Sequence, residues 1–250
     1  MVRGLLVRGL LVGLAAGLVA FVIAHVVGEP AVAAAIAVEQ GHHAHGAGEV
    51  ELVSRSVQST VGLLTALLGF GAAIGGLFGL GFAVAQGRLG AAGARTTAGV
   101  LALGGFTTII LVPFLKYPAN PPAVGSPDTI GRRTGLYFAM VLLSLLAAVI
   151  AVLVARQAHR LDRWDRALVG IGVYVALVAA CMAVMPQVDE VAPTFPASTL
   201  WAFRVGSMLT QVGVWATLGL LFGALTDRAR RAQMRSRHPL DTPRTAVPRT

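Results

Sequence analysis

The amino-acid sequence predicts an all-α fold, a polytopic membrane helix bundle of about six transmembrane helices. Hydrophobic residues make up 56% of its 250 residues and charged residues only 12%, about half the charged fraction of a typical soluble domain. Apolar runs of roughly 18 residues or more are typical of transmembrane helices. Six such runs occur, at 5–27, 57–86, 96–115, 134–155, 167–185 and 200–225. We therefore expect a transmembrane domain over 1–226, followed by a basic tail, 227–250, that is disordered and cytoplasmic.

The distribution of basic residues predicts which loops face the cytoplasm. Of the 20 basic residues, 15 lie near the N-terminus, in the loops after the second and fourth runs, or in the tail. Four lie in the remaining loops and one, Arg204, lies within the last run. The positive-inside rule places the richer side in the cytoplasm, so both termini are expected there. The same bias accounts for the net charge of +9, and no nucleic-acid partner is needed to explain it.

Glycines recur at intervals of four in the first two runs. They are Gly9, Gly13 and Gly17 in the first, and Gly71, Gly75 and Gly79 in the second. Small residues at this spacing form one helix face that lets another backbone approach closely. The pattern predicts that the first two helices pack directly on each other or on a partner's helix. It leaves open whether the chain forms a homo-oligomer.

The first run also resembles a signal peptide, because residues 1–27 contain two arginines and the small-residue string A-V-A-A-A follows. Its apolar part is longer than the usual h-region of about 7–15 residues. An uncleaved first helix is therefore the favoured interpretation. His25, near its outer end, is expected to be an interfacial histidine.

The loop after the first run, 28–56, is the most polar part of the chain. Its candidate metal ligands are Glu29, Glu39, His42, His43 and His45. Imidazole and carboxylate together suit borderline divalent metals such as Co²⁺, Ni²⁺ and Zn²⁺, and His-rich tracts are typical of metal binding. The alternative is a solvated loop whose histidines bind nothing.

The stretch 113–134 joins the third and fourth runs and contains five prolines. Proline fixes φ and removes a hydrogen-bond donor, so this stretch cannot be one continuous helix. The order Ser126-Pro127-Asp128 predicts an N-cap followed by proline at the first helical position.

The last two apolar runs are joined by a loop that carries the acidic pair Asp189 and Glu190. In the run that follows, Arg204, Ser207 and Gln211 share one helix face. A lone arginine in a transmembrane helix is costly unless it finds a partner. We expect Arg204 to pair with Asp189, Glu190 or Asp128.

Two long segments carry a resemblance to a known family: L-K-Y-P-A-N-P-P-A-V-G-S-P-D-T-I-G-R-R-T-G-L-Y and M-P-Q-V-D-E-V-A-P-T-F-P-A-S-T-L-W-A-F-R. With the Glu-Pro pair after the first run, they resemble the CbtA family of probable cobalt transporter subunits, over residues 1 to about 226. The resemblance implies a subunit for cobalt uptake in a bacterial inner membrane, associated with cobalamin synthesis. It also implies a small single-span partner of the CbtB type. The family is usually described with five spans, whereas hydropathy here predicts six.

The arginine-based topology puts the candidate metal ligands on one outer face. They are Glu29, Glu39, His42, His43, His45, Asp128, Asp189 and Glu190. A negative rim raises the local concentration of a cation, so the expected substrate is Co²⁺ or another divalent metal, with no permanently bound cofactor. No phosphate-binding glycine loop occurs, and no enzyme activity is expected. The alternatives are a scaffold without a transport path and a haem protein, which would need two facing histidines where the spans offer only His25.

Overall fold

The computed structural model describes residues 2–42, 53–88, 92–122 and 124–237, and in these ranges the chain is helical, without strands. Six helical segments are long and apolar enough to cross a membrane: Val2–Gln40, Arg55–Ala85, Ala94–Lys116, Pro127–Gln157, Arg163–Val184 and Ala197–Ser236. The predicted number of spans is thereby confirmed. The first helix has 39 residues, so it is much longer than the h-region of a signal peptide.

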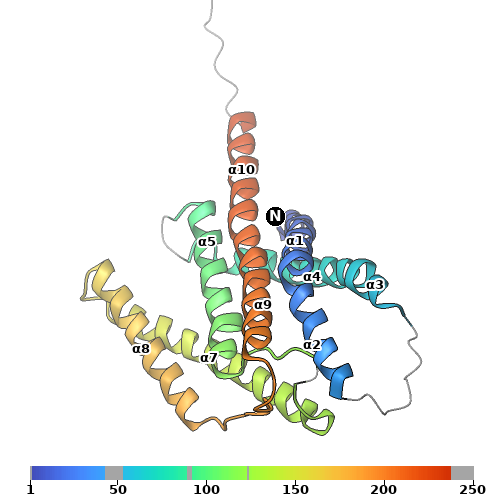
Figure 1. Ribbon diagram of the computed structural model, residues 1–250. Coiled ribbons are helices and arrows are strands. Elements are labelled where there is room, and N and C mark those ends of the chain that lie inside the picture. Colours follow the sequence, from blue (N-terminus) through green and yellow to red (C-terminus); the bar gives the residue numbers. More distant parts are fainter. Residues whose placement is uncertain (1, 43–52, 89–91, 123, 238–250) are drawn as a thin grey trace, which may run out of the picture.

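Several spans are composite (Figure 1). The first contains α1 (Val2–Ile23), the π-helical η1 (Ala24–Gly28) and α2 (Glu29–His42); the second contains α3 (Arg55–Val57), the π-helical η2 (Gln58–Gly62) and α4 (Leu63–Ala85). The third contains α5 (Ala94–Gly105), the π-helical η3 (Phe106–Leu111) and α6 (Val112–Lys116), and the fourth joins η4 (Pro127–Thr129) to α7 (Ile130–Gln157). The fifth is α8 (Arg163–Val184), and the sixth contains α9 (Ala197–Thr217), the π-helical η5 (Leu218–Phe222) and α10 (Gly223–Arg237).

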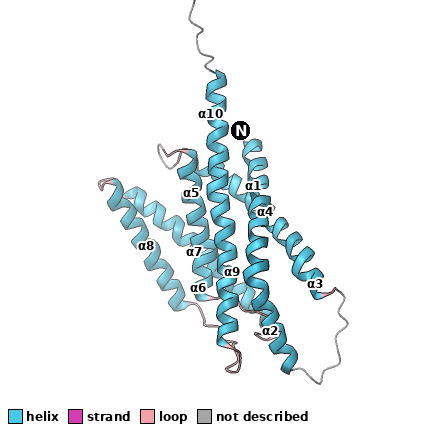
Figure 2. Cartoon of the chain, turned by 45° about the horizontal axis from the view of Figure 1, so that its top comes forward, coloured by secondary structure: helices cyan, strands magenta, loops and turns pink. Residues whose placement is uncertain are grey.

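The helices run up and down between two ends (Figure 2). One end holds the N-terminus, the start of α5, the turn between α7 and α8, and α10; we name it the inner end. The opposite end holds the end of α2 and the loops before α7 and before α9; we name it the outer end. The names follow the arginine-based prediction. α10 continues to Arg237, past the boundary expected at 226, and residues 238–250 lie outside the described residues.

The α1–α4 pair is held together by its glycines, as the four-residue spacing predicted. A Cβ atom at Gly13 would overlap the Gly71 carbonyl oxygen, and one at Gly75 would lie 2.6 Å from Gly13 Cα. A Cβ at Gly79 would lie 2.7 Å from Leu5 O. The two backbones therefore touch along their length, and no residue with a side chain fits at these positions without moving a helix.

Two of the π-helical segments lie beside prolines. Pro113 follows η3 and cannot donate the α-helical hydrogen bond to the carbonyl of Ile109. The hydroxyl of Tyr137 donates to that carbonyl instead, at 3.4 Å. Pro30 stands in the same relation to Val26, which lies in η1. Local π-helical turns of this kind let a helix continue past a missing donor.

α7 and α8 form a hairpin beside the bundle of the other spans (Figure 1). Ser144 and Tyr174 share a hydrogen bond of 2.8 Å across it. Met182 and Met185 pack with Cys181 against Met140 and Val178, so these sulfur-bearing residues serve packing. Val178 is the one buried residue within α8, and much of the surface of this helix is exposed.

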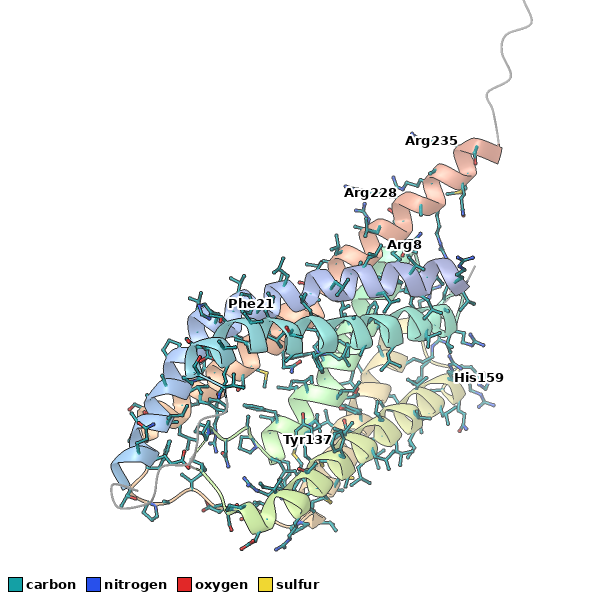
Figure 3. All side chains as sticks on the ribbon, turned by 90° about the vertical axis from the view of Figure 1, so that its right-hand side faces the viewer. Arg8, Phe21, Tyr137, His159, Arg228 and Arg235 are labelled. Atoms are coloured by element: carbon teal, nitrogen blue, oxygen red, sulfur yellow. The ribbon has the colours of Figure 1, made fainter. Side chains whose placement is uncertain are left out.

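The inner end is closed by packed aromatic rings and ion pairs. Phe222 meets Phe78 and Phe82 edge-on, with ring centroids 5.3 and 5.0 Å apart. Asp227 binds Arg95 at 3.1 Å and Arg231 at 3.2 Å. Figure 3 shows Arg8, Arg228 and Arg235 at this end, far from Tyr137.

Candidate binding cavity at the outer end

A cavity of about 610 Å³ opens among the outer loops and the ends of three helices. Its walls come from η3 and α6, from the loop after α6, from α7, from the loop before α9, and from α9. This volume is in the usual range for small-molecule sites, about 300–1,000 Å³. We name it the outer cavity.

One face of α9 supplies the polar wall of the outer cavity. Arg204, Ser207 and Gln211 all line it, as their shared helix face predicted. With a rise of about 1.5 Å per residue, the stripe descends about 10 Å, from Arg204 to Gln211. Gln211 Oε1 is buried and accepts no hydrogen bond from any residue that the structure describes.

The partner predicted for Arg204 is wrong. Its Nη2 donates to Asn120 Oδ1 at 2.9 Å and its Nε donates to Ala119 O at 3.3 Å. Within the described ranges no carboxylate lies within 4.0 Å of the guanidinium. The reason lies in the path of the proline-rich loop, which carries Asn120 over α9 while Glu190 is held by another arginine.

Glu190 is anchored to the start of the fourth span. Its Oε2 lies 3.4 Å from Arg133 Nε and accepts from Thr129 Oγ1 at 2.9 Å and from the Ser126 amide at 3.1 Å. The Thr129 hydrogen bond is the largest of the effects that lower the pKa of this carboxyl. Burial raises the pKa, and the Ser126 amide, Arg133 and Arg132 lower it further. Gly125 has φ +99°, and a Cβ there would lie 2.7 Å from Glu190 Oε2. Only glycine fits this turn without strain.

Ser126 caps the next helical turn as predicted, because its Oγ accepts from the Asp128 amide at 3.3 Å. The remaining candidate ligands lie apart from one another. Glu29 is paired with Arg55, while Asp128 is exposed in η4. Asp189 is exposed and lines the outer cavity.

The other candidates belong to α2 or to the loop that follows it. Glu39 is half-buried in the last turns of α2, and His42 is its final residue. His43 and His45 lie outside the described residues. In the described part of the chain, no group of three or more His, Cys, Asp or Glu side chains could hold a metal ion. The predicted ligands whose side chains the structure describes, Glu29, Glu39, Asp128, Asp189 and Glu190, thus form no preformed metal site.

Sequence reasoning missed three residues that shape the outer cavity. Asn120 holds Arg204, and Tyr137 lines the wall where it binds Ile109 O. Tyr117 donates to Pro186 O at 2.7 Å and ties the two outer loops together. Asn120 stands in the string P-A-N-P-P, where a side-chain amide between prolines was the available signal.

His25 makes two contacts within the protein, and its interfacial position stays a prediction. Its Nδ1 donates to Ser59 O at 3.1 Å, because a carbonyl oxygen can only accept, and its ring stacks on Phe21 at 5.5 Å.

Below Gln211 the wall becomes apolar. Val214, Trp215, Leu218 and Phe222 follow along α9 and η5, each at most 8% exposed. Trp215 lies against Gly105, where any Cβ would overlap its ring. The cavity therefore opens at the outer end and stops near the middle of the sixth span.

These features define a multi-pass helical membrane protein with a polar cavity at one end of its bundle. The chain belongs to the family described as probable cobalt transporter subunit (CbtA), whose sequence model matches residues 2–227. This family consists of transporter subunits and not of enzymes. Comparison with curated proteins and with solved structures found no match.

Proposed function

We propose that the chain is the membrane subunit of a Co²⁺ uptake system in a bacterial inner membrane, with both termini in the cytoplasm. The observation that carries this proposal is the outer cavity, whose polar stripe descends from Arg204 to Gln211. Family membership supports the metal as substrate. The positive-inside bias supports the orientation.

The outer rim captures the cation in two tiers. His42, His43, His45 and Glu39 form the first tier, at and beyond the end of α2. Asp128, Asp189, Glu190 and Glu29 form the second, at the mouth. Because Glu29 and Glu190 are already paired with arginines, Asp128 and Asp189 are the carboxylates of this tier that are free to receive a metal ion.

The two tiers give different effects on uptake of radioactive cobalt by cells. Replacing His42, His43 and His45 by alanine raises the metal concentration needed for half-maximal uptake and leaves the maximal rate nearly unchanged. Capture by the histidines also weakens as pH falls through about 6.5, since neutral imidazole is the ligand form. His159→Ala, at the inner turn, is the matched control and changes neither quantity.

Asp189→Asn lowers the maximal uptake rate, because it removes the carboxylate that lines the outer cavity. The matched control is Asp165→Asn, an exposed acid at the inner end. Expression with and without the genomic neighbours of this gene shows whether the chain works alone. If none of these substitutions changes the half-maximal metal concentration or the maximal uptake rate, the two-tier rim is contradicted.

A second candidate function, a scaffold without a path of its own, is favoured by the apolar inner half of the bundle. Between Gln211 and Thr226, the buried residues of the sixth span are Val214, Trp215, Leu218, Gly219, Phe222 and Gly223. If the chain is only a scaffold, the variants Asp189→Asn and Gln211→Leu still assemble with the partner. Uptake by the assembled complex is then the same as with the wild type. Loss of uptake with assembly intact supports the transport path.

A small single-span partner of the CbtB type would fit the membrane-facing groove between the hairpin and the bundle. This groove, of about 620 Å³, is lined by apolar side chains of α4, α5 and α7, among them Leu77, Leu101 and Val149. A cysteine at Val149 should crosslink to a cysteine in the partner's span. A cysteine at Ile171, on the exposed surface of α8, is the control and should not.

A further inference from the structure

The guanidinium of Arg204 has unused binding capacity inside the outer cavity. A guanidinium carries five N–H donors, and the structure shows hydrogen bonds from two of its nitrogens, to Asn120 and Ala119. Three N–H groups are left without a partner among the described residues. Arginine presents such groups as a planar fork, which matches the two oxygens of a carboxylate.

The charges on the cavity wall disfavour a bare cation at this depth. Arg133, Arg204 and Asp189 are the charged residues that line it. Arg133 is balanced by Glu190 at 3.4 Å, whereas Arg204 faces no carboxylate within 4.0 Å in the described chain. A naked divalent ion that moved past Asp189 would therefore approach an uncompensated positive charge.

The neutral polar groups of the cavity wall favour a ligand that carries hydrogen-bond donors as well as acceptors. Gln211 Oε1 is buried and lacks a donor within the ranges that the structure describes, and an unmet acceptor is costly. A ligand hydroxyl or a metal-bound water would satisfy it. The volume of about 610 Å³ also exceeds the space of a hydrated ion, about 180 Å³ for six waters at about 30 Å³ each.

We propose that the outer cavity takes the metal as a complex with a small carboxylate-bearing molecule. The carboxylate of the ligand pairs with Arg204, its hydroxyl meets Gln211, and its metal end faces Asp189 at the mouth. This inference rests on the proposed function for the identity of the metal. It adds that the species which enters the cavity is anionic at its inner end.

The test is equilibrium binding to the purified full-length chain in lipid nanodiscs. Three probes are compared: radioactive Co²⁺ in a non-coordinating buffer, radiolabelled citrate alone, and the cobalt–citrate complex. The wild type should bind the complex at least tenfold more tightly than either component. Arg204→Gln should weaken binding of the complex at least tenfold without weakening binding of bare Co²⁺.

Arg132→Gln is the matched control, since Arg132 belongs to the same outer end but does not line the cavity, and it should bind the complex like the wild type. Gln211→Glu keeps Arg204 and adds a negative charge, so it should also weaken binding of the complex. This second variant keeps the test usable if Arg204→Gln fails to fold.

Two results would overturn the inference. Binding of citrate alone as tightly as the complex would make the cavity a plain anion site. Binding of bare Co²⁺ to the wild type as tightly as the complex would make it a site for the free cation. Cobalt uptake by cells is a separate measurement: uptake without binding of the complex refutes this inference alone, and binding of the complex without uptake refutes the proposed function alone.

Discussion

Asp189 and Glu190 are adjacent in the sequence, yet their carboxylates have different surroundings. Glu190 is bound by Arg133, Thr129 and the Ser126 amide, whereas Asp189 is exposed at the cavity wall. The sequence predicts that both residues lie in an outer loop, but their partners depend on how two proline-rich loops cross. The same crossing gives Arg204 an amide partner instead of the expected acid. Patterns of charge along the chain carry no information on such crossings.

The hydrogen bond from Thr129 to Glu190, together with the Ser126 amide and the Arg133 ion pair, predicts a pH-dependent contribution to stability. The folded-state pKa of Glu190 lies below the ordinary value of 4.5, so the contribution is present above that value and is lost as pH falls through the lowered pKa. Glu190→Gln should therefore lower the Tm at neutral pH, and the variant and wild type should converge in acid. Thermal unfolding in detergent across pH measures this. Asp128→Asn, which removes an exposed acid, is the control, and an equal Tm difference at all pH values would contradict the prediction.

At the scale of elements, the periodic signals were the reliable ones. The glycine spacing correctly predicted that the first two helices pack face to face, because a four-residue repeat and helix geometry alone determine that face. The same helix geometry predicted that Arg204, Ser207 and Gln211 lie on one face of α9. The π-helical segments were not predicted, although Pro30 and Pro113 mark two of them. A proline signals a disturbed helix, but whether the chain kinks, ends or forms a π-turn depends on neighbours such as Tyr137.

The glycine contact predicts a sharp contrast between two alanine substitutions. Gly13→Ala should destabilise the protein by about 1–3 kcal/mol, the usual cost of overpacking, because its Cβ would overlap Gly71 O. Gly69→Ala, on α4 with nothing within 4 Å of its Cβ, should be neutral or stabilise by up to about 1 kcal/mol, the helix-propensity difference. Unfolding of the two variants by denaturing detergent compares them directly. Similar losses at both sites would mean that the helices do not touch at Gly13.

At the scale of the whole molecule, hydropathy predicted the six spans, but not how they divide into a bundle and a separate hairpin. The division follows from long-range contacts: α8 packs on α7, and Lys116 Nζ and Tyr117 Oη hold its outer end through Met182 O and Pro186 O. The apolar composition of a transmembrane helix does not specify which neighbouring helix it packs against. The sequence could therefore specify the outer end as the place of the site, and not the depth or the walls of its cavity.

The topology prediction is tested by single cysteines in a Cys181→Ala background. Cysteines at Ser54, Pro122 and Ala192, all exposed at the outer end, should react with an impermeant thiol reagent added outside intact cells. A cysteine at His159, in the inner turn between α7 and α8, should react only after the cells are opened. Outside labelling at His159, or protection at any of the other three, would refute the assigned orientation.

The sixth span also connects the cavity mechanically to the opposite side of the membrane. α9, η5 and α10 form one helical rod from Ala197 to Ser236, 40 residues long, or about 60 Å at 1.5 Å per residue. Gly219 and Gly223 rest against Ala102 and Ala98 of α5, which makes this contact a natural fulcrum. Arg235 lies 16 residues beyond Gly219 and about 24 Å from it, so a tilt of about 10° displaces it by about 4 Å. A tilt of the sixth span at the cavity beside Arg204 would thus move the arginines of α10 at the inner end, as the swing of a lever arm.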